Sequence, residues 1–302
     1  MRTKTYLFAL MTMALTLGSC SDNENGIGGE TSKYITVSTS IGNMTRVATD
    51  EKGGQTFEEG DEISVYAWTG DATVAPETRE RVVNNAINKL TNGSWVSTPQ
   101  MLWKNNRDKH YFIGVYPISA SAISDLSAGE YAFDETKQVE SDLLVAVNKD
   151  GLSYNVDEQQ PVPLTFTHVM AKLVVNLTYK NQWGGIPTVE KVVVGNAAKE
   201  ATINYLTKVV TPSTTAKEDF SLPEITENTK YVSVIIPQED VKQLTIVIDG
   251  KNFVYDNGTP FKLESGKITT VNLEVGRDEI KLGDVKITDW EDGSTFGGEA
   301  LN

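Results

Sequence analysis

The stretch LTFTHVMAKLVVNL, residues 164–177, decides the fold of this 302-residue chain. It begins with alternating apolar and polar side chains and passes into a nearly continuous apolar run from residue 170 onwards. This pattern is typical of a long β-strand with much of its surface buried. The rest of the chain must therefore supply strands to pair with it and a second layer to cover it.

Strand patterns recur on both sides of this stretch. They cover residues 33–41, 63–68, 101–103, 111–117, 143–147, 189–194, 231–236, 244–248, 253–255, 267–275 and 280–287. Residues 78–92 also fit a helical face, but Asn92-Gly93 marks a tight hairpin turn and favours a strand. Asp249-Gly250 is the strongest hairpin signal in the chain. We predict an all-β fold of two antiparallel β-sandwich domains, residues 33–160 and 161–302.

The first 32 residues are not predicted to belong to either domain. Arg2 and Lys4 precede an apolar run at 6–17, which is too short to span a bilayer as a helix. Small residues then lead to Cys20, the only cysteine of the chain. The pattern resembles a bacterial lipoprotein signal. It predicts a signal peptide at 1–19, lipidation of Cys20 as an outer-membrane anchor, and a flexible polar tether at 20–32.

The charge balance excludes one class of partner. The chain has 27 basic and 41 acidic residues, and loss of residues 1–19 would leave 25 basic residues against the same 41 acidic ones. Binding to nucleic acid needs clusters of Lys and Arg on the surface. We therefore expect no nucleic-acid partner.

Motifs for catalysis or for cofactors are missing from the sequence. It has two histidines and neither a His-Glu-x-x-His motif, a nucleophile elbow nor a phosphate-binding loop. His168 opens an apolar strand and is interpreted as structural, whereas His110 lies among charged residues and is interpreted as a solvated turn residue. We predict no catalytic residue, no metal site and no cofactor.

Other residues leave alternatives open. Trp183, in the loop NQWGG, is able to stack on a sugar, although a hydrophobic plug under the loop is favoured. The acidic pairs Glu58-Glu59 and Glu291-Asp292 resemble glycosidase carboxylates, but neighbours in a turn seldom face each other across a substrate. A monomeric surface lipoprotein that binds glycans and a surface hydrolase are thus the rival hypotheses.

Several segments together resemble the fimbrillin-like proteins of Bacteroidales, the subunits of lipoprotein-derived pili. They are Cys20 in its lipobox, Thr45-Arg46 after the first strand, residues 57–67, 111–117 and 164–173, and the end at 287–290. Their order and spacing carry the resemblance. It implies two transthyretin-like sandwich domains and a pilus subunit or adhesin on the cell surface. Its partners would be other fimbrial subunits and a host or bacterial surface receptor.

The resemblance also implies a way of assembling. A trypsin-like protease would cut between Arg46 and Val47, in a predicted exposed loop, and the first strand would leave. The residues of that exchangeable strand are Ile35, Val37 and Ile41. A neighbouring subunit would then fill the groove with a strand from near its C-terminus. The candidate donor residues here are Ile280, Leu282, Val285 and Ile287, interrupted at Gly283-Asp284.

Overall fold

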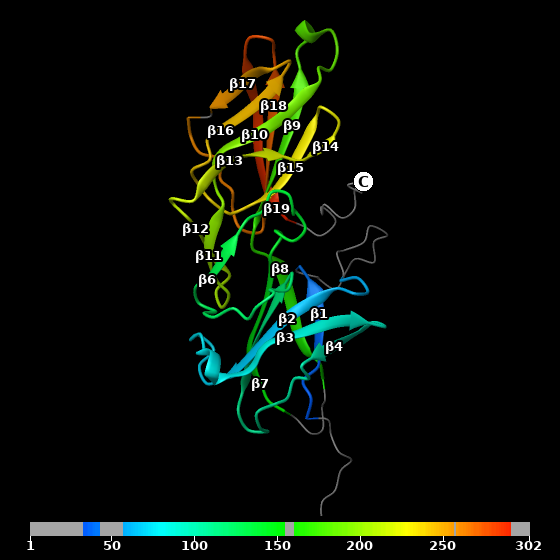
Figure 1. Cartoon of the computed structure of the whole chain (residues 1–302), viewed down its shortest axis with the longest axis vertical. Coiled ribbons are helices and arrows are strands. Elements are labelled where there is room, and N and C mark those ends of the chain that lie inside the picture. Colours follow the sequence, from blue (N-terminus) through cyan, green and yellow to red (C-terminus); the bar gives the residue numbers. More distant parts are fainter. Residues whose placement is uncertain (1–32, 43–56, 155–159, 257, 291–302) are drawn as a thin grey trace, which may run out of the picture. The chain divides into compact units, whose positions relative to one another are not determined.

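The computed structural model describes residues 33–42, 57–154, 160–256 and 258–290 (Figure 1). Within these ranges the chain forms 19 strands and two short 3-10 turns, at Thr78–Glu80 and Asn181–Trp183. The predicted all-β fold is confirmed. The predictions for the leader, for Cys20 and for the Arg46-Val47 bond concern residues outside the described ranges.

The first sheet has seven strands. In spatial order they are β1 (Val37–Ile41), β8 (Val162–His168), β7 (Leu144–Leu152), β5 (His110–Tyr116), β2 (Glu62–Thr69), β3 (Arg81–Thr91) and β4 (Ser94–Thr98). Every neighbouring pair is antiparallel except β1 and β8, which run parallel. β1 and β4 are therefore the two edge strands of this sheet.

The central strands of the first sheet are apolar on both faces. Val65 and Ala67 of β2 belong to one buried cluster, while Tyr66 and Trp68 of the same strand belong to another. Successive side chains of a strand point to opposite faces, so both faces of β2 are covered. This explains the run ISVYAW, apolar except for Ser64, which would be costly on a sheet with one face in water.

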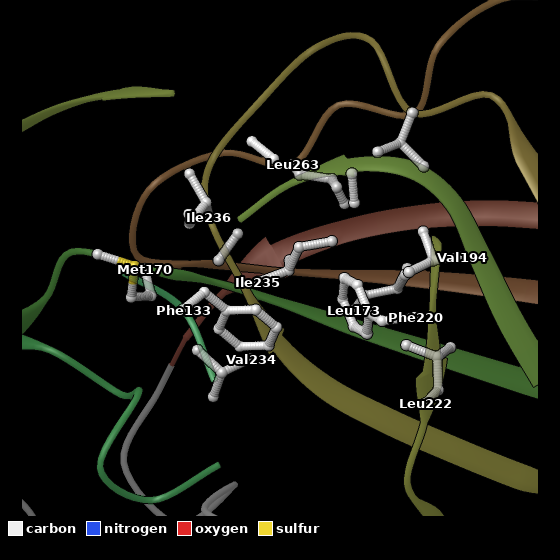
Figure 2. Packing of buried hydrophobic residues seen from close by; sticks show 14 of the residues in the cluster. Phe133, Met170, Leu173, Val194, Phe220, Leu222, Val234, Ile235, Ile236 and Leu263 are labelled. Carbon is white, nitrogen blue, oxygen red and sulfur yellow. The ribbon is translucent and has the colours of Figure 1, made fainter. Parts of the chain in front are cut away.

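Two further sheets pack face to face in the second half of the chain. One contains β14 (Glu224–Thr226), β15 (Lys230–Ile235), β9 (Ala171–Tyr179), β18 (Lys267–Val275) and β19 (Ile280–Asp289). The other contains β13 (Lys217–Leu222), β10 (Val189–Ala198), β16 (Gln243–Ile248) and β17 (Lys251–Asp256). Figure 2 shows Leu173 from the first of these layers beside Val194 and Phe220 from the second, all in one buried cluster. The decisive stretch thus forms the end of β8 and most of β9.

Both predicted hairpins are present. Thr91 of β3 pairs with Ser94 of β4 across Asn92-Gly93, and Ile248 pairs with Lys251 across Asp249-Gly250. All four turn residues have positive φ, which Asn, Asp and Gly tolerate best. Residues 81–91 are a strand, as favoured from the sequence. The expected strand at 101–103 is absent, because Leu102 makes only an isolated bridge to Tyr34.

Division of the chain into two domains near residue 160 stays a prediction. Strand pairings cross this position in both directions. β8 begins at Val162 and pairs with β1 and β7 of the first sheet. In the other direction, β6 (Gly129–Ala132) joins β11 (Glu200–Asn204) and β12 (Val209–Pro212) in a three-stranded sheet. Each half of the sequence thus lends a strand to sheets built with the other half.

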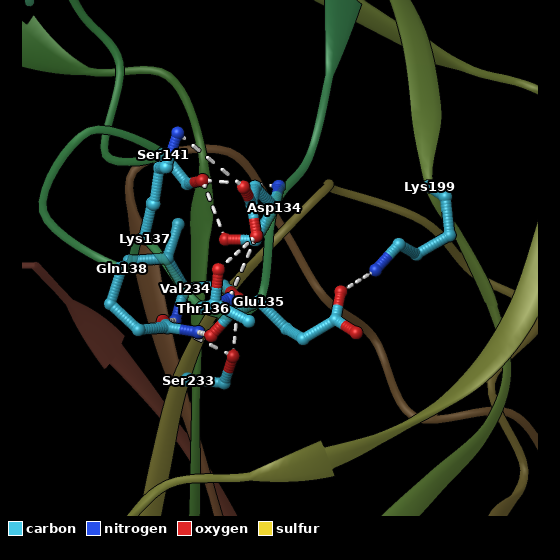
Figure 3. Close-up of polar contacts among 9 residues, drawn as sticks. All are labelled: Asp134, Glu135, Thr136, Lys137, Gln138, Ser141, Lys199, Ser233 and Val234. Atoms are coloured by element: carbon cyan, nitrogen blue, oxygen red, sulfur yellow. Dashed lines mark hydrogen bonds and ion pairs between the residues drawn. The ribbon is translucent and has the colours of Figure 1, made fainter.

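A loop after β6 holds these halves together through polar contacts (Figure 3). Gln138 Oε1 accepts a hydrogen bond from the backbone N–H of Val234 at 2.8 Å, and Glu135 forms an ion pair with Lys199. Gln138 is buried, and Val234 lies in β15 where β14 no longer pairs with it. The side chain therefore satisfies a backbone donor that the sheet leaves unpaired.

Candidate functional site: the edge strands β1 and β19

The first strand is held by backbone bonds from two separate segments. Val37 to Ile41 lie in parallel register with residues 162–166 of β8. Just before β1, the N–H of Ile35 donates to Met101 O at 2.9 Å, and the N–H of Trp103 donates to Lys33 O at 3.2 Å. Residues 33–41 therefore bridge β8 and the segment 101–103, which are far apart in the sequence.

The three predicted residues of the exchangeable strand all face a core. Ile35, Val37 and Ile41 are 2%, 6% and 7% exposed and belong to the cluster on one face of the first sheet. Ser38 between them is exposed. The alternation seen in the sequence thus corresponds to a strand with one face buried and one face outward.

A groove of about 600 Å³ runs along β1 on the side of β4. Trp95 of β4 crosses it, donating from Nε1 to Thr39 Oγ1 at 3.0 Å. Phe57 packs edge-on against Trp95, Tyr116 and Phe166, with ring centroids 5.1–5.3 Å apart. Burial, and then the charge of Asp61, raise the pKa of Tyr116 to about 12, so this phenol stays neutral. β1 consequently lies between β8 and an aromatic cluster beside β4.

The predicted donor residues all lie in one strand, β19, in the second half of the chain. β19 spans Ile280–Asp289 and pairs antiparallel with β18 as the edge strand of its sheet. The register skips Gly283, because Asn272 pairs with Asp284 and Leu273 with Leu282. This is a β-bulge, which adds one residue to one strand.

The bulge places all four apolar side chains of β19 on one face. They lie opposite residues of β18 that are buried: Ile280 opposite Val275, Leu282 opposite Leu273, Val285 opposite Val271, and Ile287 opposite Thr269. Directly paired residues share a face of the sheet. Even so, Leu282, Val285 and Ile287 are 37–38% exposed. The apolar face of β19 is therefore only partly covered: Ile280 packs against the core cluster, while the other three side chains keep more than a third of their surface in solvent.

The end of β19 is more firmly held than its middle. Trp290 is buried and stacks on His168, with ring centroids 4.1 Å apart and planes 5° from parallel. His168 Nδ1 lies 2.8 Å from Asp142 Oδ1. The structural interpretation of His168 fits this position at the end of β8, where it anchors the chain after β19.

The interpretation of His110 as a solvated residue is wrong. The side chain is fully buried at the start of β5 and packs edge-on against Trp103 at 4.9 Å. Its Nε2 accepts a hydrogen bond from the N–H of Lys104 at 3.1 Å, so the neutral tautomer carries its proton on Nδ1, 3.0 Å from Asp108 O. Burial lowers the pKa of His110. The charged neighbours in the sequence gave no sign of this burial.

Trp183 acts as the favoured plug. Its indole N–H donates to Val275 O at 3.0 Å, and the ring lies edge-on to Phe253 and beneath the Arg277 guanidinium. The ring is partly buried against the core cluster. Sugar stacking on Trp183 would require these contacts to open.

The described residues contain neither a candidate metal cluster nor a helix suited to span a membrane. No cluster of three or more His, Cys, Asp or Glu side chains suited to a metal ion occurs among them. None of the helices in that same part of the chain is long and apolar enough to cross a membrane. The sequence did not indicate the Gln138 contact or the bracket, which is the set of backbone bonds between residues 33–35 and residues 101–103. Both connect positions that no local sequence pattern relates. The glycine in the donor segment was the one available signal of the bulge.

A sequence profile of fimbrillin-like proteins matches residues 45–290, most of the chain. Among solved structures, the chain is similar to a candidate cell adhesion protein of Bacteroides uniformis, with 19% identity, a TM-score of 0.63, and coverage of 86% of this chain and 100% of the other. A candidate cell adhesion protein of Bacteroides ovatus matches at 18% identity and a TM-score of 0.62, over 85% and 98% of the two chains. The tip fimbrial protein Mfa3 of Porphyromonas gingivalis matches at 11% identity and a TM-score of 0.50, over 77% and 95%. No curated protein sequence matches the chain.

Proposed function

Because the chain belongs to the fimbrillin-like family, we propose that it is a non-enzymatic subunit or adhesin of a cell-surface fimbria that assembles by strand exchange. In this proposal it is exported as a lipoprotein anchored to the outer membrane through Cys20. A trypsin-like protease then cuts between Arg46 and Val47. Its partners are other fimbrial subunits, with a host or bacterial receptor for the finished fimbria.

The observation that carries the proposal is the position of β1. Residues 35–41 bury three apolar side chains in a core, yet β1 lies at a sheet edge and ends at Ile41, only five residues before Arg46. A cut after Arg46 would turn a covalently attached edge strand into a separate peptide. What remains is a sheet with an empty apolar slot beside β8.

The size of the effect favours exchange. Burial of an Ile or Val side chain contributes about 1.5–3 kcal/mol, so Ile35, Val37 and Ile41 together contribute roughly 5–9 kcal/mol. A whole domain is stable by only about 5–15 kcal/mol. A subunit that loses β1 would therefore be close to unfolding until another strand fills the slot, through both backbone bonds and side-chain pockets.

The proposed donor is β19, since it is an edge strand whose apolar face is partly open to solvent. An acceptor slot shaped for residues 35, 37 and 41 needs apolar side chains on a single face of the incoming strand. β19 meets that need only with its bulge at Gly283, because a straight strand would put Leu282 and Val285 on opposite faces. The bulge is thus part of the proposed donor.

The proposal is tested on the chain from Cys20 onwards, treated with a trypsin-like protease at limiting concentration. We expect a new N-terminus at Val47 by mass spectrometry, followed by ladders that resist SDS without heating. The variant Arg46→Gln should give neither, while Arg79→Gln, which alters an exposed arginine elsewhere, should behave as the parent. Cleavage at Val47 that leaves only monomers would reject strand exchange.

A further inference from the structure

A second site lies away from the β1 slot, in a cleft of about 830 Å³ at the end of β2 and the start of β3. The segment 102–104 forms one wall and residues 69–76 form another. This volume is within the range of about 300–1,000 Å³ typical of small-molecule sites. Assembly by strand exchange makes no use of it.

Apolar side chains are unusually open to solvent around this cleft. Val74 is 60% and Leu102 49% exposed, and the half-buried Trp103 lies next to them. Single exposed apolar residues are common, but here two of them and an aromatic ring lie together at the rim of a concavity, as at many binding surfaces. An aromatic and aliphatic wall suits the C–H face of a sugar ring.

The cleft has three basic and two acidic side chains, but Arg81 is buried and its guanidinium already donates to Ile123 O and Ser124 O. The remaining charged side chains are balanced. Asp71 and Glu80 supply acceptors, and Arg79 and Lys104 supply donors. A strongly anionic ligand would meet the two carboxylates, and a cationic one the two bases. Hydroxyl groups both donate and accept, so an uncharged carbohydrate can satisfy both kinds of group at once.

The loop that carries these groups is ordered by its own bonds. Asp71 Oδ1 accepts from both the N–H and the hydroxyl of Thr73 at 2.7 Å, and the indole of Trp68 donates to Asp71 O at 2.9 Å. Glu80 Oε2 accepts from the N–H of Glu77 at 3.1 Å. A wall fixed before binding lowers the entropy lost when a ligand is bound.

The opposite wall depends on the N-terminal segment. Met101 and Trp103 bond to Ile35 and Lys33, and Leu102 bridges Tyr34. These are bonds between backbone groups, so they help to set where the chain at 101–103 runs, whereas Lys104 is also held by His110 and Thr69. Removal of residues 33–35 would leave that wall without its partner strand.

We propose that this cleft binds an uncharged glycan, and that residues 33–35 hold the wall formed by Leu102, Trp103 and Lys104. The glycan site goes beyond subunit assembly. The dependence of the glycan site on residues 33–35 rests on the proposed function in one respect: the N-terminal strand must be removable. Loss of the N-terminal strand then weakens glycan binding.

Binding is tested by applying the chain from Cys20 onwards to an array of neutral oligosaccharides. Sialylated and sulfated glycans on the same array test for binding of charged ligands. The affinity of the neutral glycan that binds best is then measured by titration. Lys104→Gln and Leu102→Ser should each weaken binding by about tenfold. The matched controls Lys89→Gln and Val96→Ser, at exposed positions on β3 and β4, should leave it unchanged. No binding to neutral glycans, stronger binding to charged ones, or equal losses in the controls would overturn the site.

The dependence on the N-terminal segment is tested by an engineered protease site placed within residues 47–55, so that it does not rely on natural cleavage at Arg46. Glycan affinity is measured before the cut and after the released segment is removed. A chain beginning at Thr36 retains β1 and lacks residues 33–35, including the buried Ile35. It covers the case in which the cut protein unfolds. Both should bind about tenfold more weakly. Unchanged affinity in the folded chain from Thr36 would overturn the dependence, whether or not the fimbria assembles.

Discussion

Removing the first strand should lower the stability of the protein. The same strand, added back as a peptide, should restore it. The perturbation is a chain that begins at Val47 and is compared with one that begins at Lys33. Ile35, Val37 and Ile41 are at most 7% exposed, so their loss should lower the free energy of unfolding by roughly 5–9 kcal/mol. Loss of the backbone bonds to β8 and to Met101 adds to this value.

The assay is urea unfolding followed by tryptophan fluorescence, with a peptide of residues 33–42 titrated into the shorter chain. A ligand that binds only the folded state at about 100 times its Kd raises stability by about 2.7 kcal/mol, so the midpoint should move upward with peptide concentration. A peptide with Ser at positions 35, 37 and 41 is the matched control and should have no effect. Equal midpoints for the two chains, or equal rescue by both peptides, would refute the reasoning.

Three further predictions concern contacts that hold the fold. Gln138→Met should lower the free energy of unfolding by about 1–3 kcal/mol in urea titration, because the buried N–H of Val234 loses its acceptor. Gly114→Ala should cost about 1–3 kcal/mol in the same assay, since its Cβ would lie 2.6 Å from Phe166 Cζ, and a neutral result would show that the ring moves aside freely. Burial lowers the pKa of His110, so the unfolded chain takes up the proton more readily and stability is lost as pH falls below about 6.5. The drop in Tm between about pH 7.5 and 5.5 should be smaller in His110→Gln, which cannot titrate there.

Local patterns gave the strands and hairpins of this fold because each depends on neighbours in sequence. Asn92-Gly93 and Asp249-Gly250 could be assigned to turns, since their residues tolerate positive φ. The run at 170–177 could be assigned to a buried strand from its apolar content alone. The buried face of β1 was equally visible in its alternation.

Pairings between distant positions were beyond the reach of such patterns. Nothing near Gln138 indicates that it meets a backbone group 96 residues later. The polar neighbours of His110 suggested solvent, whereas Trp103 and the backbone of Lys104 enclose it. The two short alternations of β19 looked unsuited to one strand until the bulge at Gly283 brought them to the same face.

The parallel pairing of β1 with β8 also determines the order in which the first sheet can fold. Ser40 and Thr165, which meet side chain to side chain, are 125 residues apart, whereas β3 and β4 are joined by a two-residue turn. Closing the longer loop costs more chain entropy, so the hairpins form earlier and β1 docks last. The step that closes the sheet is then the first to reverse on unfolding. We therefore expect the slot beside β8 to be open until late in folding, before any protease acts.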